Sequence, residues 1–125
     1  MQLSLIFGAL FGLLAVVFGA FGAHALKNIL SEDQLKSFET GVKYQMYHAI
    51  LLLVLGFNLN QTSTLEKYII YCIIIGTFLF SFSIYGLVLS AAKGKKMKFL
   101  GPITPLGGLL LVIGWALLLY SFINA

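Results

Sequence analysis

Four long apolar stretches make up most of this 125-residue chain. They lie at approximately residues 3–25, 46–60, 67–92 and 105–124. A helix of about 20 apolar residues can cross the hydrocarbon core of a bilayer, where a backbone must satisfy its own hydrogen bonds. The stretches are continuously apolar rather than alternating, which favours helices over barrel strands. The sequence therefore predicts an all-α fold, an integral membrane four-helix bundle in one domain over residues 1–125.

The composition excludes an ordinary soluble domain. Hydrophobic residues make up 60% of the chain and charged residues 10%, against about 45–50% and about 25% in soluble domains. The sequence also contains no recognisable catalytic triad, metal-binding box or nucleotide-binding loop. We therefore expect a protein that is not an enzyme, with no catalytic residues, no bound metal and no cofactor.

The lysines predict the orientation in the membrane. The first connection between apolar stretches carries Lys27, Lys36 and Lys43, the second carries Lys67, and the third carries Lys93, Lys95, Lys96 and Lys98. Because cytoplasmic loops are enriched in lysine and arginine, we expect residues 26–45 and 93–104 to be cytoplasmic and both termini to lie outside. This distribution explains the net charge of +4 without a nucleic-acid partner.

Small residues form a stripe along the first apolar stretch, at Gly8, Gly12, Ala15, Gly19 and Gly22. Such spacing lets helix backbones approach closely in lipid, as in GxxxG packing. We expect the first helix to be the central packing element, through contacts within the fold or between copies of the chain. Gly107 and Gly108 are expected to serve close packing in the last helix.

The first connection contains its own helix signal. Ser31 followed by Gln34 fits a capping box, and the apolar positions that follow recur at helical spacing. We expect a short amphipathic helix over residues 32–44 at the cytoplasmic surface, turning near Gly41 into the second span. The alternative is one long unbroken helix that rises into the bilayer.

Polar side chains gather near the start of the second span and in the third. The candidate polar or ligand site comprises His24, Thr40, Tyr44, Gln45, Tyr47, His48, Ser81 and Tyr85. The two histidines are predicted to lie on the same side of the membrane, where they could bond to backbone carbonyls, help form a ligand site, or ligate haem or metal. Two histidines without supporting cysteines or paired carboxylates are a weak metal signal, so no metal is predicted.

The third connection predicts contact with lipid headgroups. The candidate contacts are Lys93, Lys95, Lys96, Lys98 and Thr104. Lysines at a membrane surface are attracted to anionic lipid by about 1 kcal/mol each. Thr104 and Pro105 are interpreted as the N-cap and first residue of the last helix, whose free amides could face a lipid phosphate.

Three ordered motifs carry a family resemblance. They are GAFGAHAL at 19–26, FETGVKYQMYH at 38–48, and LGPITPLGG at 100–108 with Gly114-Trp115. The chain resembles the YgdD/YwdK-type family of small four-span membrane proteins, which carry a domain of unknown function and have mitochondrial relatives. It departs from the family at Phe82, where a glycine is usual. The resemblance implies a bacterial inner or plasma membrane location and no established reaction.

Three functional hypotheses follow. The leading one is a non-enzymatic accessory or lipid-interacting subunit, with membrane lipids as partners. The second is a small oligomeric ligand-binding or permeation protein that uses the polar cluster around His24 and His48. The third is a haem- or quinone-associated redox accessory protein. A homo-oligomer and a larger membrane complex both remain open.

Overall fold

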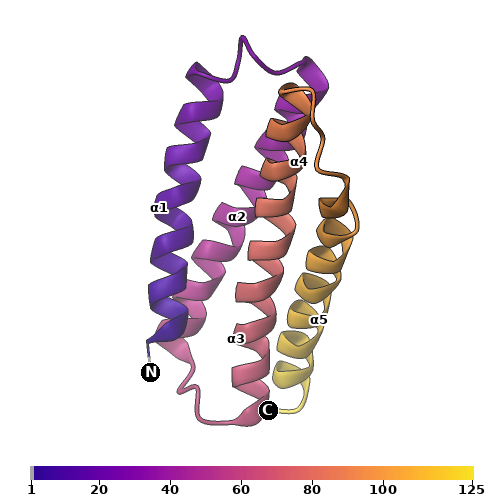
Figure 1. Ribbon diagram of the computed structural model, residues 1–125. Coiled ribbons are helices and arrows are strands. Elements are labelled where there is room, and N and C mark those ends of the chain that lie inside the picture. The colour runs from indigo at the N-terminus through magenta and orange to yellow at the C-terminus, as the bar shows by residue number, and fades with distance from the viewer. Residues whose placement is uncertain (1) are drawn as a thin grey trace.

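The computed structural model describes residues 2–125, and its four long helices run antiparallel to one another in chain order (Figure 1). The elements are α1 (Leu3–His24), α2 (Glu32–Asn58), α3 (Thr64–Thr77), the π-helical turn η1 (Phe78–Phe82), α4 (Ser83–Ala92), the 3-10 turn η2 (Lys98–Leu100) and α5 (Ile103–Ile123). The segments α3, η1 and α4 continue one another as a single long third helix. The predicted all-α fold is confirmed.

Within the described residues, three helical segments are long and apolar enough to cross a membrane. They are Leu3–His24, Thr64–Ala92 and Lys98–Ile123. The remaining long helix, α2, carries charged side chains throughout its first half, from Glu32 to Lys43, and its uncharged part is short.

The start of α2 confirms one prediction and overturns another. Gln34 N donates to Ser31 Oγ at 3.2 Å and Ser31 N donates to Gln34 Oε1 at 2.9 Å, which completes the predicted capping box. The separate surface helix over 32–44 is wrong, because α2 continues without a break to Asn58. Gly41 does not turn the chain. It lets Tyr85 pack closely, since a Cβ at Gly41 would lie 2.8 Å from Tyr85 Cε1.

The small-residue stripe of α1 faces α2. A Cβ on Gly8 would lie 3.0 Å from Ala49 O, and one on Gly22 would lie 2.9 Å from Phe38 Cε1. However, α1 is not the central element that we expected, because α2 contacts α1 on one side and α3, η1 and α4 on the other. The stripe therefore joins two neighbouring helices into a hairpin.

A second hairpin joins the third helix to α5. A Cβ on Gly76 would lie 3.0 Å from the backbone N of Leu111, and one on Gly107 would overlap the backbone of Phe80 in η1. Wider π-helical turns inside α-helices are rare and often occur at functional or strained positions. Here the turn lies where the two backbones are closest.

Bulky side chains fill the space between the two hairpins. Phe18 packs edge-on to Tyr85, with ring centroids 5.1 Å apart, and Phe82 lies 6.4 Å from Phe11. Phe82 therefore contributes aromatic packing between the two hairpins. The connection after α1 also contributes, because Leu26 is buried in the same core.

The start of α5 differs from the prediction. The helix begins at Ile103 and its N-cap is Pro102, with no side-chain cap. Thr104 is therefore not the N-cap. Its hydroxyl instead shares a hydrogen bond with the hydroxyl of Ser83 on α4, which attaches the first turn of α5 to the third helix.

Candidate functional site

Gln45 connects three helices from a fully buried position on α2. Its Nε2 donates to the carbonyl of Phe11 on α1 at 2.8 Å, and its Oε1 accepts from the hydroxyl of Tyr85 on α4 at 2.7 Å. Both ends of the amide are thus used inside the protein, as a buried polar group requires.

Two buried hydroxyls make similar connections between helices. Ser81 Oγ donates to the carbonyl of Gly41 at 2.7 Å, and Ser4 Oγ donates to the carbonyl of Leu52 at 2.6 Å. In lipid, such bonds contribute about 0.6 kcal/mol each on average. Ser81, the predicted cluster residue on the third helix, therefore hydrogen-bonds to the backbone of α2 and does not face an open cavity.

His48 is buried and uses both ring nitrogens. Nδ1 lies 2.7 Å from the carbonyl of Tyr44, which can only accept, so Nδ1 carries the proton. Nε2 accepts from Trp115 Nε1 on α5 at 3.0 Å. The geometry defines a neutral imidazole with the proton on Nδ1. Ligation of a metal or haem iron by this ring would require one of these bonds to break.

The structure separates the two histidines. His24 is exposed at the end of α1, whereas His48 precedes Ala49, the residue that faces Gly12. His24 lies twelve positions after Gly12 on the same helix, which corresponds to roughly 18 Å along the axis at 1.5 Å per residue. The two histidines, whose contact the sequence left open, therefore lie far apart in this structure.

The eight residues of the predicted cluster divide into two groups. Gln45, His48, Ser81 and Tyr85 are buried, whereas His24, Thr40, Tyr44 and Tyr47 are exposed. Thr40 Oγ1 donates to the carbonyl of Lys36 on its own helix. Within residues 2–125, no group of three or more histidine, cysteine or carboxylate side chains is arranged to hold a metal ion.

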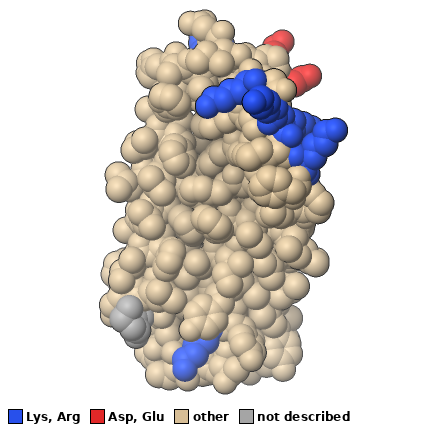
Figure 2. Space-filling model, viewed as in Figure 1, with Lys and Arg blue, Asp and Glu red and all other residues tan. Residues whose placement is uncertain are grey.

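Lysines gather at one end of the molecule, which we call the lysine-rich end (Figure 2). It consists of residues 25–31, residues 93–102 and the first turns of α2. The four candidate headgroup lysines are all exposed there, and Figure 2 shows lysine colour at the opposite end only in one small patch. Both termini lie at that opposite end (Figure 1).

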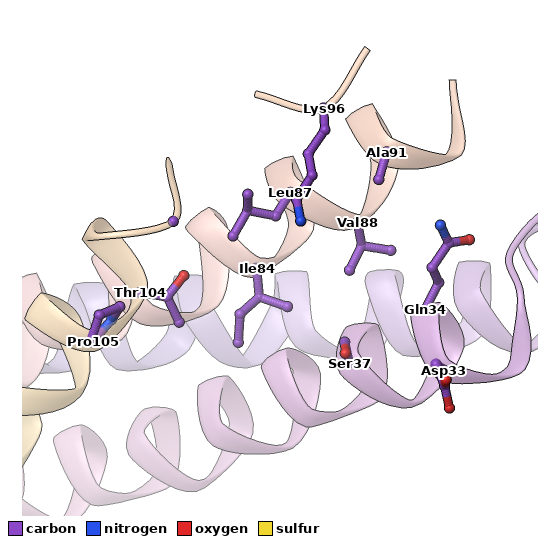
Figure 3. A pocket seen from close by; sticks show the side chains of 11 residues that line it. Asp33, Gln34, Ser37, Ile84, Leu87, Val88, Ala91, Lys96, Thr104 and Pro105 are labelled. Carbon is purple, nitrogen blue, oxygen red and sulfur yellow. The ribbon is translucent and has the colours of Figure 1, made fainter. Parts of the chain in front are cut away.

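A groove of about 520 Å³ opens beside the lysine-rich end, between α2, α4 and the start of α5 (Figure 3). Its lining residues are Asp33, Gln34, Ser37, Ile84, Leu87, Val88, Ala91, Lys96, Gly101, Thr104 and Pro105. The side supplied by α4 is apolar, and the polar groups come from α2, from the third connection and from Thr104. This volume falls in the range of about 300–1,000 Å³ that is usual for small-molecule sites.

Two of the predicted headgroup contacts, Lys96 and Thr104, line the groove, but the groove itself was not predicted from the sequence. Its walls come from three segments that are far apart in the chain, 33–37, 84–91 and 96–105. No local pattern shows that these segments meet. Trp115 was also missed as the partner of His48, because a tryptophan in an apolar run indicates only burial or lipid contact.

The helices and their apolar surfaces define the class as an α-helical membrane protein with several candidate transmembrane segments. The chain belongs to the family described as Protein of unknown function (DUF423), whose model matches residues 18–108. This match contains the motif stretches 19–26, 38–48 and 100–108, and the family resemblance is confirmed.

Several relatives are each named a UPF0382 membrane protein. That of Staphylococcus aureus (strain bovine RF122 / ET3-1) is 42% identical over 97% of this chain and 95% of its own length. That of Staphylococcus haemolyticus is 39% identical over the same shares, and that of Staphylococcus saprophyticus is 39% identical over 94% of each chain. No solved structure matches this chain significantly.

Proposed function

We propose that this protein is a non-enzymatic membrane protein that binds anionic phospholipid at its lysine-rich end. The observation that carries the proposal is the groove, which combines an apolar side on α4 with Lys96 at its edge. A phospholipid has the same two parts, an acyl chain and a phosphate. The partner that fits is therefore a lipid of the surrounding bilayer.

The charge around the groove supports an anionic lipid. The connections that form the lysine-rich end and the first turns of α2 carry seven lysines and three carboxylates. Each lysine near an anionic membrane surface contributes about 1 kcal/mol of attraction. This attraction raises the local concentration of anionic lipid beside the groove, where the apolar side can hold one molecule in place.

In the proposed arrangement the chain crosses the membrane four times, and α2 is the span in addition to the three candidate segments. α2 lies alongside α1 over most of its length, from Phe38 opposite Gly22 to Gly56 opposite Leu5. A helix that lies alongside a membrane span over most of its length crosses the same depth of the bilayer. The exposed side chain of Lys43 can extend toward the headgroups.

The positive-inside rule supports a cytoplasmic lysine-rich end and external termini, in the inner or plasma membrane. The groove would then face the cytoplasmic leaflet, whose anionic lipids match its surroundings.

The test is to fill the groove without changing its charge. Ala91→Phe and Ser37→Phe place a ring in the groove from opposite walls, and Ala116→Phe on the exposed side of α5 is the matched control. Native mass spectrometry of protein extracted in mild detergent counts the phospholipids that remain bound. We expect one lipid per chain in the wild type and the control, and its loss in both groove variants.

Retention of the same lipid number in folded Ala91→Phe and Ser37→Phe would contradict the proposal. Circular dichroism and gel filtration establish that the variants are folded. Ser37 is exposed, so its substitution is the safer of the two for folding.

A further inference from the structure

The third connection runs back along α4 instead of projecting from its end. Thr104 in the first turn of α5 shares a hydrogen bond with Ser83, which lies nine positions before Ala92, the last residue of α4. At 1.5 Å per residue, α5 therefore begins roughly 14 Å before the level at which α4 ends. Residues 93–102 cover this distance beside α4 (Figure 1).

The lengths of the helices place this connection relative to the bilayer. The third helix, Thr64–Ala92, has 29 residues and extends roughly 43 Å, whereas α5 has 21 residues and extends roughly 31 Å. A hydrocarbon core is about 30 Å thick, and a bilayer with its headgroups is about 40–45 Å thick. The length of α5 therefore matches the hydrocarbon core. Residues 93–102 then lie beside the part of α4 that crosses the headgroup layer.

Two apolar side chains and one serine attach the connection to α4. A Cβ on Gly86 would lie 2.5 Å from Leu100 Cδ1 and 3.6 Å from Met97 Cε, so both side chains cover this glycine. Ser90 Oγ accepts from the backbone N of Met97 at 3.0 Å, and the carbonyl of Ser90 accepts from the backbone N of Lys95 at 3.1 Å. These contacts fix which side of the connection faces away from the protein.

Phe99 lies on the side that faces away, where it is 67% exposed. Its neighbour Leu100 lies at the level of Gly86, three positions after Ser83. Phe99 is therefore roughly 5 Å from the start of α5 along the membrane normal, close to the edge of the hydrocarbon core. The lysines of the connection are all exposed around it. Lysines beside an exposed apolar ring are typical of segments that lie in the membrane interface.

We infer that the third connection is a membrane-inserted turn, in which the ring of Phe99 enters the leaflet at the lysine-rich end. The lysines extend from the same turn toward the lipid phosphates, as long basic side chains do at a membrane boundary. The partner of this surface is the bilayer itself. Insertion requires only that α4 and α5 cross the membrane, and it does not require a lipid in the groove.

Ile29 offers a matched comparison, because it is 65% exposed at the same end of the molecule but on the first connection. Phe38, six positions into α2, packs against Tyr85 with ring centroids 5.0 Å apart. Tyr85 adjoins Gly86, the level at which Phe99 lies. The start of α2 is therefore roughly 9 Å farther from the membrane centre than Phe99, and Ile29 precedes that start.

Spin labels on the full chain test this difference in depth. With Cys72→Ala as background, one nitroxide is attached in each of three variants, Phe99→Cys, Ile29→Cys and Val112→Cys. Val112 is exposed near the middle of α5 and marks the acyl-chain region. The proteins are placed in vesicles of phosphatidylcholine and phosphatidylglycerol. Electron paramagnetic resonance then compares collisions with oxygen, which concentrates in lipid, and with a water-soluble nickel chelate.

We expect the oxygen-to-nickel collision ratio at Phe99 to be severalfold higher than at Ile29 and lower than at Val112. A ratio at Phe99 no higher than at Ile29 would overturn the inference. All three sites are exposed, so the labels do not displace the core. A nickel-accessible label at Phe99, in a protein whose bound lipid is lost on Ser37→Phe, would overturn membrane insertion and leave the proposed function intact.

A second measurement concerns the ring itself. Phe99→Ser should lower the temperature of thermal unfolding in the same vesicles by more than Ile29→Ser does, because only Phe99 exchanges contact with lipid for a hydroxyl group. Circular dichroism follows unfolding of both variants. Equal shifts in the two variants would overturn the insertion of the ring.

Discussion

At the scale of single residues, the bonds of His48 specify its protonation state. Its ring donates to Tyr44 O and accepts from the indole of Trp115. A second proton would sit on Nε2 and point at the indole N–H of Trp115. The hydrogen bond to Trp115 therefore exists only while the imidazole is neutral. His48 therefore acts here as a connector between α2 and α5.

Trp115 is the only tryptophan of the chain, so its fluorescence reports on this bond directly. We expect acidification to change the emission of the wild type in one step, as protonation of His48 breaks the bond. His48→Gln should lack that step. An acid-induced step of unchanged size in folded His48→Gln would show that another group causes it.

Gln45 and Tyr85 allow a double-mutant test of the interior. Gln45→Leu and Tyr85→Phe should each lower the free energy of unfolding by about 1–2 kcal/mol, because each leaves a buried partner without its bond. The double variant should lose less than the sum of the two, by about 0.5–1.5 kcal/mol. Unfolding in mixed micelles, followed by circular dichroism, measures all four proteins. Strict additivity would mean that the bond contributes nothing.

At the scale of elements, glycine determines which helices form pairs. Gly107 meets the backbone of Phe80, whereas a Cβ on the neighbouring Gly108 would lie 3.6 Å from the ring of Phe80, an ordinary contact. Two adjacent glycines of one helix therefore have different roles. Gly107 permits close approach of backbones, and Gly108 does not need to be glycine on steric grounds.

This difference predicts the effect of a single methyl group. Gly107→Ala should destabilise the protein by about 1–3 kcal/mol, the usual cost of overpacking. Gly108→Ala should be neutral or slightly stabilising, because alanine favours helix more than glycine does. Thermal unfolding in detergent compares the two variants. Equal stability would mean that α5 moves away from η1 at little cost.

At the scale of the whole molecule, the lysines and the termini lie at opposite ends. With Cys72→Ala as background, Thr62→Cys and Lys95→Cys place single thiols at the two ends. A membrane-impermeant maleimide should label Thr62→Cys in intact cells and Lys95→Cys only after the cells are opened. The reverse pattern would invert the proposed orientation and move the groove to the outer leaflet.

Features that depend on neighbours in the sequence could be predicted from it. The capping box at Ser31 and the small-residue stripe of α1 involve residues three or four apart, so their spacing in the sequence was sufficient to predict them. The spacing of residues in the sequence did not show that the α1 stripe packs on α2. It also did not show the hydrogen bond between Trp115 and His48 or the groove. Each of these depends on which helix faces which. The helix break near Gly41 was predicted wrongly because glycine serves turns and close packing equally well.

The two hairpins have a consequence for how the chain is made. Glycine contacts join α1 to α2 and the third helix to α5, so the closest backbone contacts form between helices that follow each other in the sequence. The first hairpin can close before the second has left the ribosome. Two polypeptides, cut in the short connection between Asn58 and Thr64, would then each insert as a helical pair and reassemble through the aromatic side chains between them.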